Sequence, residues 1–436
     1  MQSPQVETLG PLERRISLSV QLPAIEAEVA GRLREIARTA RMDGFRKGKV
    51  PMSVIGKQYG GEVRQEVLGR SLEQAFATSV SQLGLRVAGF PRIEAAGGEP
   101  VNGALEFYAV FDVYPEVTLG DLSTVEVTRP VVPVTDAEVD RTLDILARQR
   151  TVWTEAARPA ALGDRVRADF AGTIDGQAFA GGEGKDIQVE LGAGRTLKEF
   201  ETGFIGLSAG GTATVEVNFP ADYHGKEVAG KTALFTLTVH EVSEPVVPAI
   251  DEVFASSLGI EGGDVAGLRA EIRGNLEREV KQRIRARVKE QVMDGLLACT
   301  SIDLPKSMVQ AEVEGLMAQM RRDLQERGMK SDDASLPVQM LEKQAERRVA
   351  LGLILSDIVQ KQKISAQPEQ VSAMIDELAQ NYEDPQELVN WYRSSPERMQ
   401  EIQSLAVEDN AVEWILGQVK VTDRDTTFEE LMGRSK

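Results

Sequence analysis

The feature that most constrains the fold of this chain is a change of sequence pattern near Thr151 and a second change after residues 245–248. Between these points glycine is frequent and short alternating runs indicate strands, whereas both flanks contain apolar residues at helical spacing. A chain of 436 residues corresponds to about three domains at roughly 150 residues each. We therefore predict a multidomain α+β protein in which a β-rich segment separates two helix-containing parts.

The first part, residues 1–112, has the pattern of a compact α+β domain. Residues 12–22 and 104–114 alternate like strands, and residues 24–42 and 61–84 carry apolar side chains on one helical face. Residues 115–133 are expected to be extended and contain three prolines. A helix is predicted over 134–150, because Thr135 and Glu138 have the spacing of a capping box.

The β-rich segment, residues 151–244, contains four clear strand patterns and one helical pattern at 197–204. The strand patterns are RVRADFAGTI, DIQVEL, TATVEVNF and TALFTLTVHEV. Residues 245–436 then predict an all-α domain. Its expected helices cover 264–299, 305–328, 337–361, 368–381 and 396–419, and prolines stand where several of them begin.

Composition excludes several kinds of site. One cysteine and two histidines, His224 and His240, cannot build a disulfide framework or a Cys/His zinc site, so we expect no metal. The glycine-rich pieces lack the spacing of a nucleotide-binding loop, so we expect no cofactor. No window approaches the roughly 20 apolar residues of a membrane span, and the first residues lack the apolar core of a signal peptide. We therefore expect a cytoplasmic protein without a membrane partner.

The net charge of −18 argues against a general nucleic-acid binder, but one segment is basic. Residues 32–57 contain eight lysines and arginines against two acidic residues. Within it, the loop GFRKGKVP at 44–51 offers one apolar anchor, Phe45, together with Arg46, Lys47 and Lys49. Such a loop suits a surface of phosphate and RNA-associated protein. The alternative interpretation is an ordinary solvated loop between helices.

Aromatic residues gather in the β-rich segment of a chain that has few of them. Seven lie within 66 residues: Phe170, Phe179, Phe200, Phe204, Phe219, Tyr223 and Phe235. They could form the core of a small domain or line a ligand pocket. The residues alone leave both interpretations open.

Together these motifs resemble the bacterial trigger factor family. GFRKGKVP resembles its ribosome-docking signature, and the tail at 245–436 is similar to its chaperone domain. The segments DFAGTIDGQAFAGG, LGAGRTLKEFETGFIGLSAGG and VNFPADYHG, followed by the strand with Phe235, have the order and spacing of an FKBP-type peptidyl-prolyl isomerase. The resemblance covers essentially the whole chain in the same domain order.

The resemblance implies four parts. Residues 1–112 would dock on the protein and rRNA of the large ribosomal subunit near the nascent-chain exit. Residues 113–150 would be a linker that packs with the C-terminal body, 151–244 the inserted isomerase domain, and 245–436 a helical chaperone domain that forms a cradle. The implied function is an ATP-independent chaperone that binds nascent and unfolded polypeptides for folding or export, and isomerises X-Pro bonds. The family is also associated with cell division, and homodimerisation of the free form is left open.

The resemblance also implies site residues. Phe45, Arg46 and Lys47 match the ribosome-contacting Phe-Arg-Lys. The positions that match the FKBP proline pocket, and that would carry the catalysis, are Phe170, Phe179, Leu197, Phe200, Phe219, Tyr223 and Phe235. Two features depart from the family pattern. Leu197-Lys198-Glu199 stands where the family often has Ile-Pro-Gly, and Ala180 replaces an acidic residue.

Client binding would need a different surface. Nine of the 12 methionines lie beyond residue 245, and Met317, Met320 and Met329 are candidates to face an open cradle. The alternative is that such methionines are helix core residues. Two other functions are weighed: a free prolyl isomerase, which would not need the loop at 44–51, and a periplasmic chaperone, which would need a signal peptide.

Overall fold

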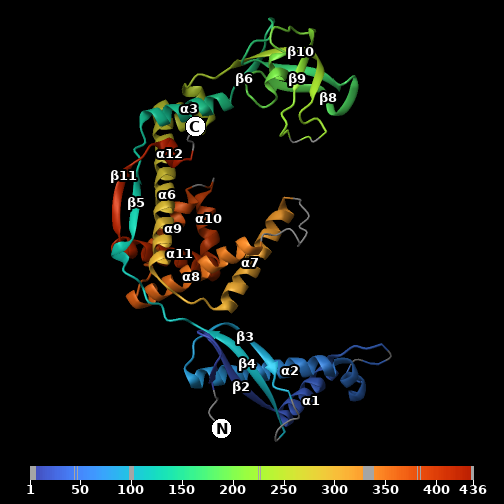
Figure 1. The fold of residues 1–436 in the computed structure, drawn as a ribbon, viewed down its shortest axis with the longest axis vertical. Helices are drawn as coiled ribbons and strands as arrows, with labels where there is room; N and C mark the ends of the chain where they lie inside the picture. The colour runs from blue at the N-terminus through green and yellow to red at the C-terminus, as the bar shows by residue number, and fades with distance from the viewer. Residues whose placement is uncertain are drawn as a thin grey trace. The chain divides into compact units, whose positions relative to one another are not determined.

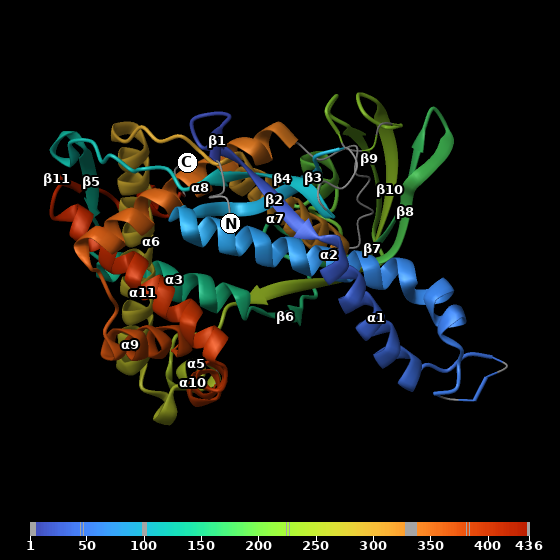
Figure 2. The same cartoon turned by 90° about the horizontal axis from the view of Figure 1, so that it is seen from below.

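The computed structural model describes residues 6–43, 45–46, 48–97, 103–223, 225, 227–327, 338–380, 382 and 384–433. The chain divides into two compact units (Figures 1 and 2). The first comprises Met1–Arg129 and Arg285–Arg424, and the second comprises Pro130–Ile284 and Asp425–Lys436. Their helices and strands confirm the predicted multidomain α+β class.

The first unit begins with a four-stranded antiparallel sheet in the order β1-β2-β4-β3. Its strands are β1 (Val6–Thr8), β2 (Glu13–Gln21), β3 (Val87–Ala95) and β4 (Ala104–Val113). Along β2, Ile16, Leu18 and Val20 are buried and the intervening residues are exposed, as the two-residue period of a strand requires. These side chains share one core with helices α1 (Leu22–Thr39) and α2 (Met52–Leu83).

Two local features of this part differ from the prediction. Helix α2 begins at Met52 rather than at residue 61, because Gly60 and Gly61 are accommodated inside it, despite costing about 1 kcal/mol each relative to alanine. Strand β3 was not predicted, because a bulge between Ala88 and Arg92 interrupts its alternation.

The rest of the first unit is mainly helical. Helix α6 (Val265–Cys299) contributes its last residues, and the following helices are α7 (Lys306–Glu326), α8 (Val338–Gln362), α9 (Pro368–Ala379), α10 (Pro385–Arg393) and α11 (Pro396–Leu416). The single turn η1 (Leu122–Thr124) precedes β5 (Glu126–Val131), which pairs with β11 (Lys420–Asp425). Every predicted tail helix is confirmed within its described residues, whereas α10 and β11 had not been predicted as elements.

The second unit contains a five-stranded antiparallel sheet. Its strands are β6 (Val152–Glu155), β7 (Arg165–Ile174), β8 (Gln177–Glu190), β9 (Thr212–Asn218) and β10 (Thr232–Val246), with β10 paired to β6, β7 and β9. The four predicted strand patterns and the short helix α4 (Lys198–Thr202) are confirmed. The core of the sheet is continuous and includes Val166, Ala168, Leu237 and Val239.

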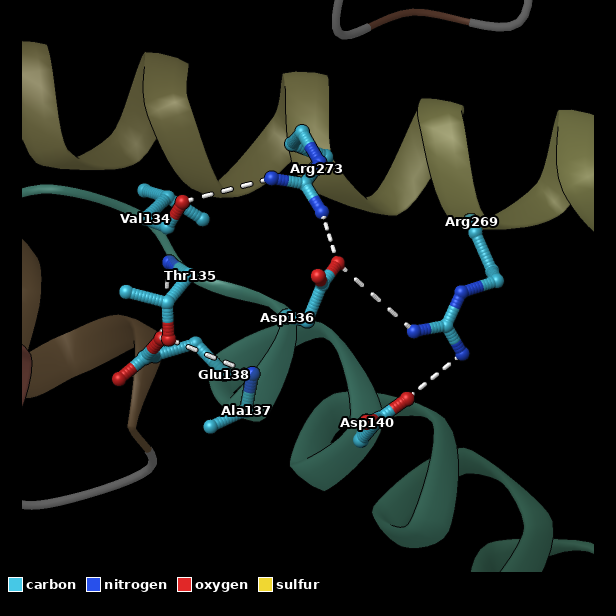
Figure 3. A network of polar contacts seen from close by, with 8 residues as sticks. All are labelled: Val134, Thr135, Asp136, Ala137, Glu138, Asp140, Arg269 and Arg273. Atoms are coloured by element: carbon cyan, nitrogen blue, oxygen red, sulfur yellow. Dashed lines mark hydrogen bonds and ion pairs between the residues drawn. The ribbon is translucent and has the colours of Figure 1, made fainter.

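Helices also contribute to the second unit: α3 (Asp136–Gln149), α5 (Glu252–Ser257), the turn η2 (Glu261–Gly263), the first part of α6 and α12 (Phe428–Leu431). The capping box predicted for Thr135 and Glu138 is present at the start of α3. Beside it, Arg273 of α6 pairs with Asp136, and Arg269 pairs with Asp140 at 2.6 Å (Figure 3). Exposed ion pairs contribute at most about 1 kcal/mol each, so the apolar core between α3 and α6 dominates this packing.

Among the residues described, none of the helices combines the length and the apolar character needed to cross a bilayer.

Candidate functional site

The seven residues predicted to line the isomerase site lie together in the strand-rich part of the second unit. They come from separate elements: Phe170 from β7, Phe179 from β8, Leu197 and Phe200 from the start of α4, Phe219 and Tyr223 from the segment after β9, and Phe235 from β10. We call these seven residues the aromatic cluster. Leu197 and the six rings all belong to one hydrophobic core group.

Phe235 is the centre of the aromatic cluster. Its ring centroid lies 5.4 Å from that of Phe200, 5.8 Å from Phe170, 6.0 Å from Phe179 and 6.4 Å from Phe219. Two of these contacts, with Phe179 and Phe200, are edge-to-face, which is a favourable geometry for aromatic rings, and the other two are tilted. Tyr223 joins through Phe219, with centroids 4.8 Å apart. Four phenylalanine rings thus pack around Phe235, and a fifth ring, that of Tyr223, is connected to it through Phe219.

Burial separates the aromatic cluster into two layers. Phe200, Phe219 and Phe235 are buried, with exposed fractions of 8%, 8% and 5%. Phe170, Phe179, Leu197 and Tyr223 are only half-buried. The cluster therefore offers ring edges to solvent above an apolar base, which suits a small apolar ring such as the pyrrolidine of proline. Phe204 is fully buried behind Phe200 and belongs to the core.

Glycines allow the rings to lie against the sheet. A Cβ at Gly172 would lie 2.5 Å from the Phe235 ring, and a Cβ at Gly184 would collide with the Phe170 ring. The distance at Gly184 would be 2.3 Å, and real Cβ atoms do not approach other heavy atoms as closely as at either position. Both residues must therefore be glycine if the two rings are to keep their places. The sequence signal was the glycine frequency of the segment, but it did not show which rings the glycines accommodate.

One functional candidate was missed from the sequence. Glu201 of α4 is 5% exposed and its carboxylate accepts hydrogen bonds from the backbone N–H groups of Gly192 (2.9 Å), Gly194 (3.4 Å) and Thr196 (3.2 Å). Burial is the largest influence on its pKa and raises it, but the N–H groups and the Thr196 hydroxyl together outweigh burial and lower the pKa. Its only sequence signal was its position directly after Phe200.

A second polar group lies on the same sheet. Asp169 of β7 accepts the Asp186 N–H at 2.7 Å, and its carboxylate lies 3.0 Å from Nε2 of His240 on β10. These hydrogen bonds, that of the Asp186 backbone first, lower the pKa of Asp169. His240 therefore has a partner on the neighbouring strand, whereas His224 lies outside the described residues.

The loop predicted to dock on the ribosome connects α1 and α2. Phe45 is 42% exposed although it is apolar, and Arg46 and Lys49 are exposed beside it. Two backbone hydrogen bonds shape the loop, from Phe45 N–H to Met42 O at 3.1 Å and from Lys49 N–H to Arg46 O at 2.9 Å. The third predicted residue, Lys47, lies outside the described residues.

The methionines predicted to bind clients have mixed surroundings. Met317 and Met320 on α7 are half-buried against a core formed by Leu316, Leu341 and Ala345. Met329 lies outside the described residues. More exposed apolar side chains, which were not predicted, are Met340 (71%) on α8 and Trp391 (48%) on α10.

Three family models match the chain in the expected order. The N-terminal model of bacterial trigger factor protein matches residues 2–146, the FKBP-type peptidyl-prolyl cis-trans isomerase model matches 156–240, and the C-terminal model of trigger factor matches 264–417. A solved structure of the trigger factor chaperone aligns with 95% of this chain and 99% of its own, at 17% identity and a TM-score of 0.46.

Curated relatives match along the full length. Trigger factor of Aromatoleum aromaticum is 49% identical over 100% of both chains, and that of Laribacter hongkongensis is 49% identical over 99% of both. Trigger factor of Nitrosospira multiformis is 48% identical, again over 99% of both chains. With this identity over the full length and an FKBP-type isomerase domain in place, the chain belongs to the trigger factor family of ribosome-associated chaperones.

Proposed function

We propose that the aromatic cluster is the site at which this isomerase domain binds and rotates X-Pro bonds. The supporting observation is that four rings converge on Phe235 while Phe170, Phe179 and Tyr223 keep partly exposed edges. The proline ring of the substrate packs on this surface, with Leu197 and Phe200 at one side. Phe219 and Tyr223 approach from the segment after β9.

The chemistry asks for no nucleophile. Rotation about the prolyl bond is opposed by a barrier of about 18–20 kcal/mol, because the planar amide is stabilised by resonance. The twisted amide has lost that resonance and its charge separation, so an apolar surface favours it over the planar form. A thousandfold acceleration requires about 4 kcal/mol of such differential stabilisation. The Tyr223 hydroxyl donates a hydrogen bond to one substrate carbonyl, and the Leu197 N–H donates a hydrogen bond to another.

The test is turnover of a proline-containing peptide by the Tyr223→Phe and Phe200→Ala variants. Both are expected to be slower while the domain stays folded, because each removes a substrate contact. The control is Phe90→Ala, since Phe90 is 92% exposed on β3 and belongs to the other unit. Normal turnover by both site variants would refute this assignment.

We further propose that Phe45, Arg46 and Lys47 dock the chain on the protein and rRNA of the large ribosomal subunit. The exposed Phe45 flanked by exposed cations supports this, because an apolar anchor and phosphate-binding charges act together there. The chaperone binds nascent polypeptides through the helical part, where Met317, Met320 and Met329 contribute apolar contact. A free isomerase would have no use for the docking loop.

The remaining expectations stay proposals. We propose functional boundaries near residues 112, 150 and 244, supported by the sheet of residues 6–113 and the strands of 152–246. We also propose a cytoplasmic location with a ribosome-bound fraction, and roles in protein export and cell division. Sedimentation of the ribosome-free protein over a range of concentrations tests for a homodimer.

A further inference from the structure

A buried carboxylate shapes the segment that leads into the aromatic cluster. Glu201 follows Phe200 on α4, and its two oxygens face back toward the preceding loop, residues 191–197. Oε2 accepts the N–H groups of Gly192 and Gly194, whereas Oε1 accepts both the N–H and the hydroxyl of Thr196. One side chain therefore fixes three positions of the loop.

The loop needs such an anchor because it contains two unusual backbone conformations. Gly192 has φ +89° and Gly194 has φ +67°, both in the left-handed region that glycine reaches easily. Glycine also loses the most conformational freedom on ordering, so a loop with two glycines is intrinsically loose. Hydrogen bonds donated to a buried, ionised acceptor are stronger than those between neutral groups and offset that loss.

The negative charge of Glu201 is stabilised by neutral hydrogen-bond donors. Among the described residues, no lysine, arginine or histidine forms an ion pair with it, and three N–H groups and one hydroxyl converge on it instead. The pKa of Glu201 is accordingly lowered, so the carboxylate is ionised at neutral pH. Its removal would leave the three N–H groups and the hydroxyl, which are part-buried, without this acceptor.

The anchored loop ends at the substrate side. Thr196 is held at both its N–H and its hydroxyl, and the next residue is Leu197, which packs in the aromatic cluster and occupies the N-cap position of α4. Because a peptide group is planar, the bond from the Thr196 N–H fixes the Arg195–Thr196 peptide, and the bond from the hydroxyl restrains the Thr196 side chain, so Leu197 continues from a residue held at two points. The turn itself has no proline at Lys198 or Glu199 to restrict its backbone, so its order depends on hydrogen bonds such as these.

We propose that Glu201 is a positioning residue for prolyl isomerisation, because its carboxylate holds the 192–196 loop so that Leu197 and Phe200 meet the substrate in one fixed geometry. This inference rests on the assignment of the aromatic cluster as the substrate site. Glu201 itself does not contact the proline; it acts through Thr196, Leu197 and the helix that carries Phe200.

The test compares Glu201→Gln with Glu199→Gln in the full-length protein. Glu199 lies on the same short helix, is exposed and undergoes the same loss of charge, so it is a matched control. We expect Glu201→Gln to lower kcat by about tenfold or more per folded molecule, since small misplacements of reacting groups cost up to about a hundredfold. Glu199→Gln should stay within about twofold, and KM should change less than kcat in both variants.

Three further tests distinguish a positioning role from a purely stabilising one. Amide hydrogen exchange at Gly192, Gly194 and Thr196 should accelerate in Glu201→Gln and not in Glu199→Gln. The wild-type rate should fall as the pH drops through the lowered pKa of Glu201, below its ordinary value near 4.5, whereas Glu201→Gln should lack this step. A Glu201→Asp variant keeps the charge on a shorter arm and should recover part of the rate.

The outcomes are distinct. A Glu201→Gln protein that is folded and turns over like Glu199→Gln overturns the inference, as does a rate loss that only follows the unfolded fraction. If Glu201→Gln does not fold, Thr196→Val decides, because it removes one hydrogen bond and should slow kcat by about threefold; normal turnover then overturns the inference. Normal turnover of Phe200→Ala and Tyr223→Phe would instead refute the substrate site itself.

Discussion

The carboxylate of Asp112 on β4 accepts the backbone N–H of Ser307 at 2.8 Å and lies 2.7 Å from the Ser307 hydroxyl at the start of α7. Asp112 is 8% exposed, and the two residues are 195 positions apart in the chain. The aspartate thus acts as a helix cap supplied from the sheet, because it satisfies an N–H of the first helical turn that has no partner within the helix.

The first prediction concerns this cap. Asp112→Asn replaces a charged acceptor by a neutral one, and hydrogen bonds to charged groups contribute about 1.5–3 kcal/mol. We expect the amide exchange of Ser307 to accelerate by about tenfold, since about 1.4 kcal/mol corresponds to a factor of ten. Asp303→Asn is the control, because Asp303 is exposed and also precedes α7. Equal exchange in both variants would show that the cap contributes nothing.

The second prediction concerns the glycine pair inside α2. A Cβ at Gly61 would meet no atom within 4 Å, and its φ is not in the left-handed region. Gly61→Ala should therefore stabilise α2 by about 0.5–1 kcal/mol. The amide hydrogens of Val63 and Val67 in α2 should then exchange more slowly than in the wild type. At Gly89, where φ is +78° and a Cβ would lie 2.7 Å from Ser307 Oγ, the same change should destabilise instead. If Gly61→Ala and Gly89→Ala both stabilised the protein, or both destabilised it, this explanation would be contradicted.

The third prediction concerns the glycines under the rings. Gly184→Ala places a methyl group where the Phe170 ring now lies, so the ring or β8 must shift. We expect isomerase turnover to fall by about tenfold or more, because substrate-contacting groups lose their alignment. Gly69→Ala on α2 is the control, since nothing lies within 4 Å of its added Cβ. Retention of full turnover by Gly184→Ala would mean that the position of Phe170 does not matter.

The fourth prediction concerns pH. Arg158 donates two hydrogen bonds to the buried Asp164, at 2.6 and 3.0 Å, and these lower its pKa, although burial opposes the shift. A carboxyl group whose pKa is lowered by folding stabilises the fold above its ordinary pKa of about 3.9. That stabilisation is lost as the pH falls through the lowered value. The melting temperature of Asp164→Asn should therefore lie below wild type at pH 7, and the gap should narrow below pH ~4.

Asp175→Asn provides the comparison for that experiment. Asp175 is exposed in the turn between β7 and β8, and asparagine tolerates its φ of 52°. Its melting temperature should follow wild type at every pH. A gap between Asp164→Asn and wild type that does not depend on pH would rule out the proton-linked explanation.

Local sequence patterns predicted the helices and strands better than they predicted which strands pair with one another. The alternation of residues 165–174 gave the bounds of β7, and Thr135 and Glu138 marked the start of α3, because both signals act over a few residues. Pairing of β5 with β11 joins residues some 290 positions apart, and no local pattern carries that information. The sequence pattern predicts the start of α2 at residue 61, nine residues too late, because a Gly-Gly pair is typical of a helix boundary whereas Gly60 and Gly61 lie inside this helix.

The candidate site was predictable only in part. The residues alone showed that aromatics gather between 170 and 235, but their assembly around Phe235 was expected from the family resemblance and not from spacing. Glu201 could not be identified, because its role depends on three backbone N–H groups whose directions are set by the folded loop. Every residue except proline carries a backbone N–H, so residue identities do not indicate which of these groups will bind a carboxylate.

The most direct test of the account is ribosome cosedimentation of the wild type and a Phe45→Ala/Arg46→Ala/Lys47→Ala variant, each at two salt concentrations. Contacts to phosphates release counterions, so wild-type binding should weaken as salt rises. The account predicts salt-sensitive binding by the wild type and loss of binding by the variant, with peptide isomerisation unchanged in both. Equal binding of the two proteins would contradict docking through this loop, and absence of binding by either would contradict the ribosome-associated function.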